Sequence, residues 1–352
     1  MALISSESTI HDIAKRLNVS TTTVWRAIND RPRVSPKTRK RVIDEVERVG
    51  YRPSLVAQTL SWGRTHTIGV VVPTIGNSVH AALVRAAEQA AFSRDYSMVL
   101  CDTDFNIERE QKHLDLLIRR RVEGVLLVPF AKVEATGRSH LERLKKAGVT
   151  VVCMQQCLPD APVPQVAPEN FGAASAMSKH LIALGHKRIA FMHGGLPSWY
   201  VSMNERLEGY QAALREAGLP VDRNLIVEVG SFESILPDGD GTFNVDRVNS
   251  LLKQKDRPTA IFAPVDVLAI KIMKAAQDLG LRVPEDVAVV GFDNIQMSAY
   301  TDPPLTTVRH PAAEVGRQAA EMLFKQLSGG GSEVPVIERV PCELVIRRSC
   351  GN

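Results

Sequence analysis

The sequence has few cysteines, few aromatic residues and no long hydrophobic run. Its five cysteines among 352 residues are an odd number and lie far apart, which argues against a disulfide framework. No stretch approaches the roughly 18 uninterrupted apolar residues of a membrane span, and the first residues lack the basic, apolar and small-residue order of a secretion signal. We therefore expect a cytoplasmic protein that does not enter a membrane.

Catalytic and metal-binding motifs are missing too. The sequence contains no G-x-x-x-x-G-K-[ST], G-x-G-x-x-G, G-x-S-x-G or H-E-x-x-H. Cys153 and Cys157 lack a second ligand pair at zinc-site spacing, so they more simply end a buried strand and begin a loop. His180 and His186 are six apart and lie on different faces of a helix. We expect no catalytic residue, no metal and no cofactor.

Positive charge is concentrated at the N-terminus. The chain carries +4, yet residues 1–64 hold twelve Lys or Arg against six acids, which leaves the rest at −2. Between Arg31 and Arg41 six basic residues occur without an acid. Such a run is typical of a surface that neutralises phosphates, although for a charge run alone a solvated charged face is the better explanation.

Residues 9–50 have the pattern of three short helices. Apolar residues recur at helical spacing in each, and Asn18 suits the left-handed conformation of a tight turn between the first two. The third helix should end at Gly50 and brace the other two. Together they predict a helix-turn-helix, in which the N-terminal capping residues are Thr9, Ser20 and Ser35, the last followed by Pro36.

From Thr67 onward, short apolar runs alternate with helical patterns about every thirty residues, which predicts an α/β body with parallel sheets. Eight runs are more than one modest open sheet usually holds, so two similar lobes are favoured over a single barrel. The expected strands lie near residues 68–73, 97–102, 122–129, 149–154, 188–193, 226–229, 260–263 and 287–292.

Motifs along nearly the whole chain carry a family resemblance. The segment from Thr9 to Val24, with Arg26 and Asn29 after it, closely resembles the DNA-binding headpiece of the lactose-repressor and purine-repressor family of transcriptional regulators. Residues 56–60 resemble the hinge helix of that family. The resemblance continues through residues 180–190, 283–294, 304–308 and 344–350.

The resemblance implies a division of the chain. It predicts an all-α helix-turn-helix headpiece at 8–52, a hinge helix and linker at 53–66, and an effector-binding and dimerisation body at 67–352. The body should resemble a two-lobed periplasmic binding protein. Its N-lobe is expected at about 67–164 and 308–337, and its C-lobe at about 165–307 and 338–352.

The second helix of the headpiece is the expected recognition helix. Its start enters the major groove, where Thr21 and Thr22 can meet base edges and Arg26 can reach guanine O6 and N7. Helix capping for the threonines and solvation for the arginine are the plainer alternatives. Phosphate contacts, which position the helix, are expected from Ser20, Asn29 and Arg33.

Trp25 departs from the small residue that the family usually has there. It could pack on the sugar-phosphate backbone, tilt the helix, or cover Ile10 and His11. In the hinge, Ala57 and Leu60 are also expected at the DNA. Leu60 matches the leucine that wedges into the minor groove at the operator centre, and packing within the hinge is its alternative.

The resemblance also implies an effector site between the lobes. Arg206 matches a ligand-holding arginine and Asp293 matches a carboxylate after a C-lobe strand, where ligands of open α/β sheets are found. Phe232 matches an aromatic residue that closes over the ligand. Tyr200 and Ser202 lie on the same candidate loop as Arg206. Core packing for Phe232, and simple exposure for the other two, are the alternatives.

The remaining effector candidates depart from the sugar-binding pattern. Val265 stands where sugar-binding members often have Asn, and Gln155 where many have Asp. After Asn77, Val79 and His80 replace two aromatic residues. These changes weaken the case for a hexose stacked on rings; His80 could meet an acidic ligand or be a surface histidine.

The leading hypothesis is therefore a ligand-responsive transcriptional regulator, most simply a repressor. It would bind a pseudo-palindromic operator in double-stranded DNA as a homodimer, with its affinity changed by a sugar or other polar metabolite between the lobes. The alternative is a solute-binding or enzymatic α/β protein with an incidental basic arm. The missing secretion signal and catalytic motifs count against that alternative.

Overall fold

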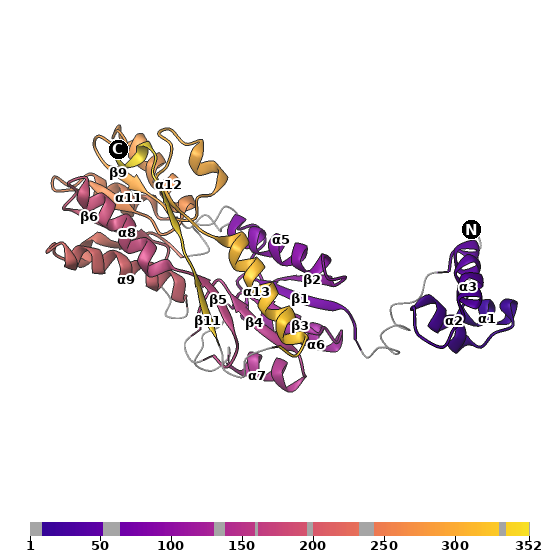
Figure 1. Cartoon of the computed structure of the whole chain (residues 1–352). Coiled ribbons are helices and arrows are strands. Elements are labelled where there is room, and N and C mark those ends of the chain that lie inside the picture. Colours follow the sequence, from indigo (N-terminus) through magenta and orange to yellow (C-terminus); the bar gives the residue numbers. More distant parts are fainter. Residues whose placement is uncertain are drawn as a thin grey trace. The chain divides into compact units, whose positions relative to one another are not determined.

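The computed structural model describes residues 9–51, 64–129, 138–158, 161–195, 200–231, 243–330 and 336–351. The chain divides into two compact units, Met1–Thr65 and His66–Asn352, which are drawn in Figure 1. Within the described residues, no helix is long and apolar enough to cross a membrane.

The first unit consists of α1 (Ile10–Leu17), α2 (Thr21–Ile28) and α3 (Pro36–Val49). As predicted, the side chains of Thr9, Ser20 and Ser35 each accept a backbone hydrogen bond at a helix start. The turn between α1 and α2 uses a left-handed Asn18, with φ 50°, and Gly50 ends α3 with φ 63°. The helices meet on a small core, which includes the fully buried Ile13, Val24 and Val42.

The second unit begins with a six-stranded parallel sheet, in the order β11-β5-β4-β3-β1-β2. One face is covered by α5 (Ser78–Phe92) and α13 (Ala312–Leu327), and the other by α6 (Ile107–Arg119) and α7 (Arg138–Lys146). The sheet and the helices on its two faces form the N-lobe (Figure 1). Its strands are β1 (Thr67–Val72), β2 (Ser97–Asp102), β3 (Gly124–Leu127), β4 (Thr150–Met154), β5 (Gln165–Pro168) and β11 (Ile337–Val340).

The C-lobe contains a four-stranded parallel sheet in the order β7-β6-β8-β9. One face packs against α8 (Asn170–Ala183) and α9 (Val201–Glu216), and the other against α11 (Val245–Leu252) and α12 (Asp266–Asp278). Two lobes with parallel sheets confirm the predicted fold class. The strands are β6 (Ile189–His193), β7 (Ile226–Glu228), β8 (Ala260–Phe262) and β9 (Ala288–Val290).

Four strands have no counterpart in the sequence prediction, and they move the lobe boundaries. Besides β5 and β11, the antiparallel pair β10 (Thr307–Arg309) and β12 (Glu343–Val345) forms a two-stranded sheet. The chain crosses between the lobes three times. Because β5 and β11 pair in the N-lobe sheet, the first crossing follows Pro168 and the third follows Val340, both later in the sequence than expected. The second crossing lies at His310, because β10 pairs with β12 and packs with the C-lobe.

Candidate nucleic-acid interface and ligand site

The outer face of α2 presents the residues expected to contact DNA. Val24 and Ala27 are buried against α1 and α3, so the opposite face is turned to solvent. Thr22 is exposed, and Arg26 and Asn29, both half-buried, follow it at intervals of four and three residues. This spacing places the three side chains in one row along the helix.

Two of the expected phosphate contacts already have structural roles in the first unit. The Ser20 Oγ accepts a hydrogen bond from the Thr23 backbone N at 3.1 Å, so its hydroxyl caps α2. The Asn29 Nδ2 donates to the Trp25 carbonyl at 2.9 Å. Trp25 itself is half-buried, and its Nε1 has no hydrogen-bond partner among the described residues.

The basic run from Arg31 to Arg41 divides into two groups. Arg39 holds the corner between α2 and α3: it donates to the carbonyls of Ala27 at 3.0 Å and Arg31 at 2.7 Å and pairs with Asp30 at 2.8 Å. Arg41 donates to the Leu17 carbonyl. The prediction of a phosphate surface from all six residues was therefore too broad.

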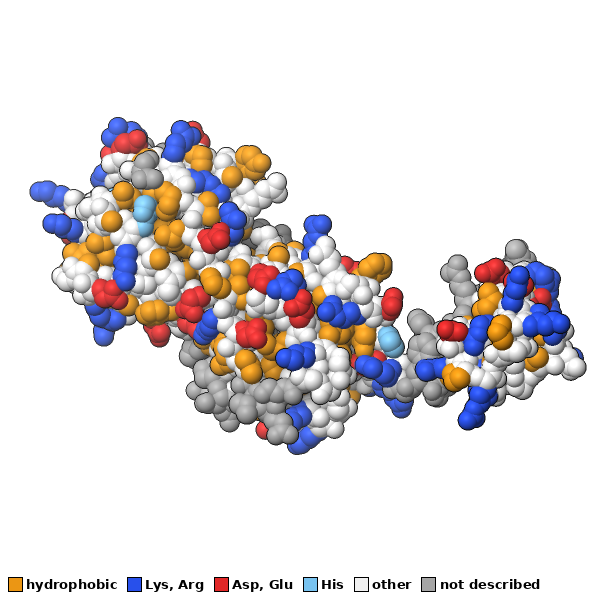
Figure 2. Space-filling model, in the orientation of Figure 1, with side chains coloured by type: hydrophobic (Ala, Val, Ile, Leu, Met, Phe, Trp, Pro, Cys, Tyr) orange, Lys and Arg blue, Asp and Glu red, His pale blue; other side chains and the backbone are white. Residues whose placement is uncertain are grey.

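The other four basic residues of the run are exposed and, within residues 9–51, have no acidic partner. Arg33 has a left-handed backbone, with φ 70°, in the loop between α2 and α3. On the face drawn in Figure 2, Lys and Arg side chains predominate over acids on this unit. A surface of this kind can neutralise phosphates. Its members are Arg31, Arg33, Lys37 and Lys40.

The second unit brings Arg206 and Asp293 together, as the sequence predicts. Arg206, in α9, is 1% exposed, and its Nη1 lies 3.5 Å from the Asp293 Oδ1. The same guanidinium donates to the Asn170 Oδ1 at 3.0 Å and the Pro264 carbonyl at 2.5 Å. Its Cζ lies 3.6 Å from the centre of the Phe292 ring. The arginine is thus fixed from four sides, and its charge faces the end of β9.

A second carboxyl group, which the sequence analysis did not single out, supports this loop. Asp266 is fully buried, and it accepts hydrogen bonds from the Thr307 hydroxyl at 2.5 Å and the Ile295 backbone N at 2.9 Å. Gly291 leaves room for it, because a Cβ there would lie 2.2 Å from the Asp266 Oδ1. Asp266 therefore fixes the segment that carries Asp293.

Burial changes the protonation of both carboxyl groups. It raises the pKa of Asp266 to about 8, and the nearby Asp293 charge adds to that rise. Burial also raises the pKa of Asp293 to about 7, against the opposing charge of Arg206. Near neutral pH the Asp266 carboxyl is thus mainly protonated, which suits a structural role.

The N-lobe candidates divide between the core and polar positions at strand ends. Val79 is 6% exposed and packs into the N-lobe core, and Asn77 caps α5 by accepting from the Val79 backbone N at 2.8 Å. His80 is 1% exposed, so it is not a surface histidine. Gln155 directly follows β4, is 4% exposed, and its Oε1 has no partner among the described residues.

The bond made by His80 defines its tautomer. Its Nδ1 lies 2.8 Å from the Thr74 carbonyl, which can only accept, so Nδ1 carries the proton and Nε2 is the acceptor of the neutral ring. Burial lowers the pKa of His80 to about 4. The ring is therefore neutral, and it offers a ligand an acceptor more readily than a positive charge.

The remaining C-lobe candidates also divide into residues of the hydrophobic core and a buried polar side chain without a hydrogen-bond partner among the residues that the structure describes. Tyr200 and Val265 are buried in the hydrophobic cluster of α11 and α12. Ser202 is 1% exposed, and its Oγ has no hydrogen-bond partner in the described part of the chain. Phe232 lies outside the described residues, as do Ala57 and Leu60 of the hinge.

His310 is a site residue that sequence reasoning missed. It lies at the second crossing between lobes, is 6% exposed, and neither ring nitrogen has a partner within the described ranges. Its backbone N donates to the Asp293 carbonyl at 3.3 Å. Burial lowers its pKa well below the usual value, and electrostatic interaction with Arg206 and His80 acts in the same direction. Its position directly after the motif at residues 304–308 was the available signal.

Direct contacts join the two lobes beside these residues. The Val201 backbone N, at the start of α9, donates to the Gln156 Oε1 at 3.0 Å, next to Ser202 and Gln155. Arg339, in β11, pairs with Glu205, in α9, at 2.5 Å. Phe105, from the N-lobe, packs against the C-lobe cluster. The unpaired polar atoms of Gln155, Ser202 and His310 therefore follow the carboxyl ends of strands where the lobes meet, the usual place for ligands in such folds.

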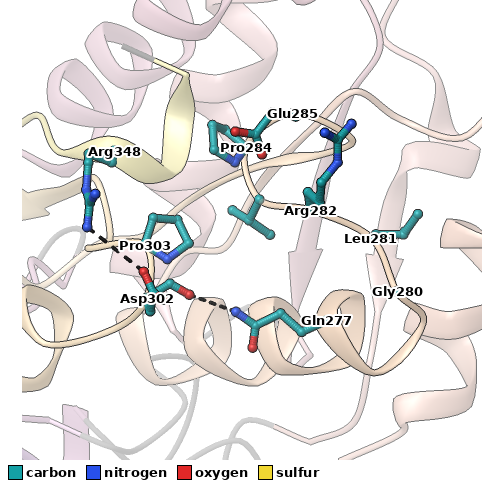
Figure 3. A pocket seen from close by; sticks show the side chains of 10 residues that line it. Gln277, Gly280, Leu281, Arg282, Pro284, Glu285, Asp302, Pro303 and Arg348 are labelled. Atoms are coloured by element: carbon teal, nitrogen blue, oxygen red, sulfur yellow. Dashed lines mark hydrogen bonds and ion pairs between the residues drawn. The ribbon is translucent and has the colours of Figure 1, made fainter.

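A pocket of about 620 Å³ elsewhere in the C-lobe contains none of the predicted ligand residues. It lies between the end of α12, residues 280–285 and the Asp302-Pro303 turn (Figure 3). Its polar groups largely pair with each other: the Gln277 Nε2 donates to the Asp302 carbonyl at 2.7 Å, and Arg348 lies 3.9 Å from the Asp302 carboxylate.

Comparison with known proteins extends these observations. Residues 9–54 match the family described as bacterial regulatory proteins, lacI family, and residues 178–350 match a periplasmic binding protein-like domain. Catabolite control protein A of Priestia megaterium is 35% identical over 97% of this chain and 98% of its own length. The HTH-type transcriptional repressor PurR of Photobacterium profundum is 34% identical over the same shares.

Solved structures resemble the chain over nearly its whole length. A lac repressor dimer bound to operator and the anti-inducer ONPF has a TM-score of 0.81 with 25% identity, covering 97% of this chain and 98% of its own. A complex of the transcriptional regulator CelR with cellobiose has a TM-score of 0.71 with 30% identity, covering 97% and 99%. Both similarities extend over headpiece and body.

Proposed function

Because the chain belongs to the lacI family of bacterial regulatory proteins, we propose that it represses transcription by binding a pseudo-palindromic operator as a homodimer. A small polar molecule held between its lobes would change that affinity. The observation that carries this function is the presence of two features in one chain. One is an outer face of α2 on which the Thr22 and Arg26 side chains have no partner among the described residues, and the other is a buried arginine–aspartate pair in the body, together with unpaired polar atoms where the lobes meet.

We assign base readout to residues on the outer face of α2. Arg26 would make a bidentate contact with guanine, and Thr21 and Thr22 would meet neighbouring base edges. Arg33 contacts phosphates in this proposal, together with the exposed basic residues around it. Ser20 contributes through the helix start that it caps, where backbone N–H groups favour a phosphate.

Selection of bound sequences from random duplex DNA tests the DNA half of the proposal. The full-length protein should enrich a site with two-fold symmetry, because a homodimer presents two copies of α2. Enrichment of no symmetric site would contradict the assignment. The Arg26→Ala variant serves as the internal control, since it should relax the preference at one base pair of each half-site.

We assign the ligand to the groups between the lobes. Arg206 supplies donors, Asp293 an acceptor, the neutral His80 ring an acceptor at Nε2, and the neutral His310 ring can donate or accept. Gln155 adds an amide from the N-lobe. A buried site with this many polar groups fits a sugar or another polar metabolite with several hydroxyl, amide or acidic groups.

A thermal-shift screen of sugars and other polar metabolites tests the ligand half. A true ligand should raise the Tm of the wild type, because binding to the native state stabilises it. Asp293→Ala should abolish that shift, while Asp278→Ala, an exposed change in α12, should leave it unchanged. A compound that stabilises all three proteins equally binds elsewhere, and the assigned site would then be wrong.

A further inference from the structure

We propose that the body itself carries a second DNA contact, a basic edge of the N-lobe that binds phosphates flanking the operator. The edge consists of Arg119, Arg120, Arg121, Lys145 and Lys146, all exposed. This inference rests on the proposed function, because it adds to an operator complex formed by α2.

The topology places these residues at one end of the N-lobe sheet. All six strands are parallel, so their amino ends share an edge, and α6 and α7 run back toward it and end there. Backbone hydrogen bonds connect the segments that follow α6 and α7 with the start of β1. The backbone N of Glu123, just after α6, donates to the Thr67 carbonyl at 2.9 Å, and the backbone N of Thr150, just after α7, donates to the Glu123 carbonyl at 3.1 Å. In Figure 1, the start of β1 and helix α6 lie at the same end of the lobe.

The charge of this end is opposite to that of the body as a whole. We count the last three residues of α5, α6, α7 and α13 and the segment that follows each. Arg94 and Lys325 then join the edge, and the acids among the described residues of these segments are Asp95 and Glu123. Glu123 is engaged, since it accepts from the His66 backbone N at 2.7 Å and the Tyr96 hydroxyl at 2.8 Å. Counted over these described residues, the end carries a net +5, whereas the formal charge of the body as a whole is −2.

Helix dipoles do not account for the cluster. A basic residue in a last turn complements the partial negative charge of a helix end, and Arg119 does so in α6. The C-terminal ends of α11 and α12 carry the same partial negative charge, yet neither helix has a basic residue in its last turn. In the first unit, Arg39 is held by carbonyls and by Asp30. By contrast, the side chains of Arg119, Arg120, Lys145 and Lys146 make no ion pair or hydrogen bond with the described residues.

The position of the edge supports DNA as its partner. The body is connected to the DNA-binding unit at this end, because β1 begins at Thr67 and unit 1 ends at Thr65. Residues 52–63 are all that lies between Tyr51, just after α3, and Arg64, where the described chain resumes before β1. Twelve residues span at most about 40 Å. Phosphates beside the operator are therefore the nearest dense negative charge that the edge can meet.

The test compares two variants with equal loss of charge. The edge variant carries Arg119→Gln, Arg120→Gln, Lys145→Gln and Lys146→Gln, and the control carries Lys187→Gln, Arg223→Gln, Lys253→Gln and Lys255→Gln, all exposed in the C-lobe. Each full-length protein is titrated with the operator selected from random DNA and with the same operator extended by about 15 bp, one and a half helical turns, on each side. Titrations are repeated over a range of salt concentrations.

The wild type and the control should bind the extended duplex about tenfold more tightly than the minimal one, with a steeper salt dependence. The edge variant should lose that advantage and keep its affinity for the minimal operator. Equal losses in edge and control variants, or no gain from extension in the wild type, would overturn the inference. Failure of the wild type to bind any selected operator would instead count against the proposed function.

Discussion

Asp266 gives the sharpest quantitative test of how the ligand site is built. Its buried carboxyl has a pKa of about 8, against 3.8 for an unperturbed group, so folding favours the protonated form. The resulting stabilisation is complete below pH 4 and is lost progressively as the pH rises toward 8. Each pH unit in this interval lowers the free energy of unfolding by up to about 1.4 kcal/mol through this one group.

The Asp266→Asn variant imitates the protonated form. Its Nδ2 can donate to the Thr307 hydroxyl while its Oδ1 accepts from the Ile295 backbone N, so both hydrogen bonds of the native side chain persist. The free energy of unfolding of the variant should therefore match that of the wild type within about 1 kcal/mol below pH 4, and at pH 5 the variant should already be more stable by about 1.5 kcal/mol. Between pH 5 and pH 7 the free energy of unfolding of the wild type should fall by about 2 to 3 kcal/mol relative to that of the variant, because the asparagine side chain does not ionise.

Urea unfolding monitored by circular dichroism at pH 5, 6 and 7 measures this difference. Asp278→Asn, at the exposed end of the same helix, is the matched control and should follow the wild type at every pH. If the curves of free energy against pH for Asp266→Asn and the wild type are parallel, Asp266 is ionised in the folded protein and the reasoning is wrong.

Four further substitutions test the DNA-binding unit and the hinge. Arg26→Ala should lower specific binding by about 1 to 3 kcal/mol and relax one base pair per half-site, whereas Arg33→Ala should weaken all sequences alike and reduce the salt slope by about one; identical base profiles would refute the assignment. Arg39→Ala should destabilise the first unit by about 2 to 3 kcal/mol, since two carbonyls and Asp30 lose their partner; an unchanged melting curve would contradict this. Leu60→Ala should reduce operator bending in a gel-phasing assay, because the apolar wedge that offsets unstacking is gone.

Features set by neighbouring residues could be predicted from the sequence, while those set by distant contacts could not. The caps of α1, α2 and α3 and the turn at Asn18 depend on spacing within a few residues, and the structure confirms them. Strands β10 and β12 have three residues each and exist because they pair with one another. No local pattern distinguishes them from loops.

The same distinction applies within the site. Arg206 and Asp293 could be named because their motifs carry a family resemblance. Asp266 was missed because its role arises from Thr307, Ile295 and the space left by Gly291, which the sequence does not bring together. Arg39 was counted with its charged neighbours, although the carbonyls at the end of α2 bind it.

Coupling between the ligand and operator is the central claim, and one titration tests it directly. The selected operator is titrated with wild type and Asp293→Ala, each with and without the compound that raises the Tm of the wild type alone. The wild-type affinity should change by about 5- to 150-fold, which corresponds to 1 to 3 kcal/mol of coupling. Asp293→Ala should bind the operator within about threefold of the ligand-free wild type and show no response. A variant that responds fully at unchanged ligand concentrations would show that Asp293 is not in the site.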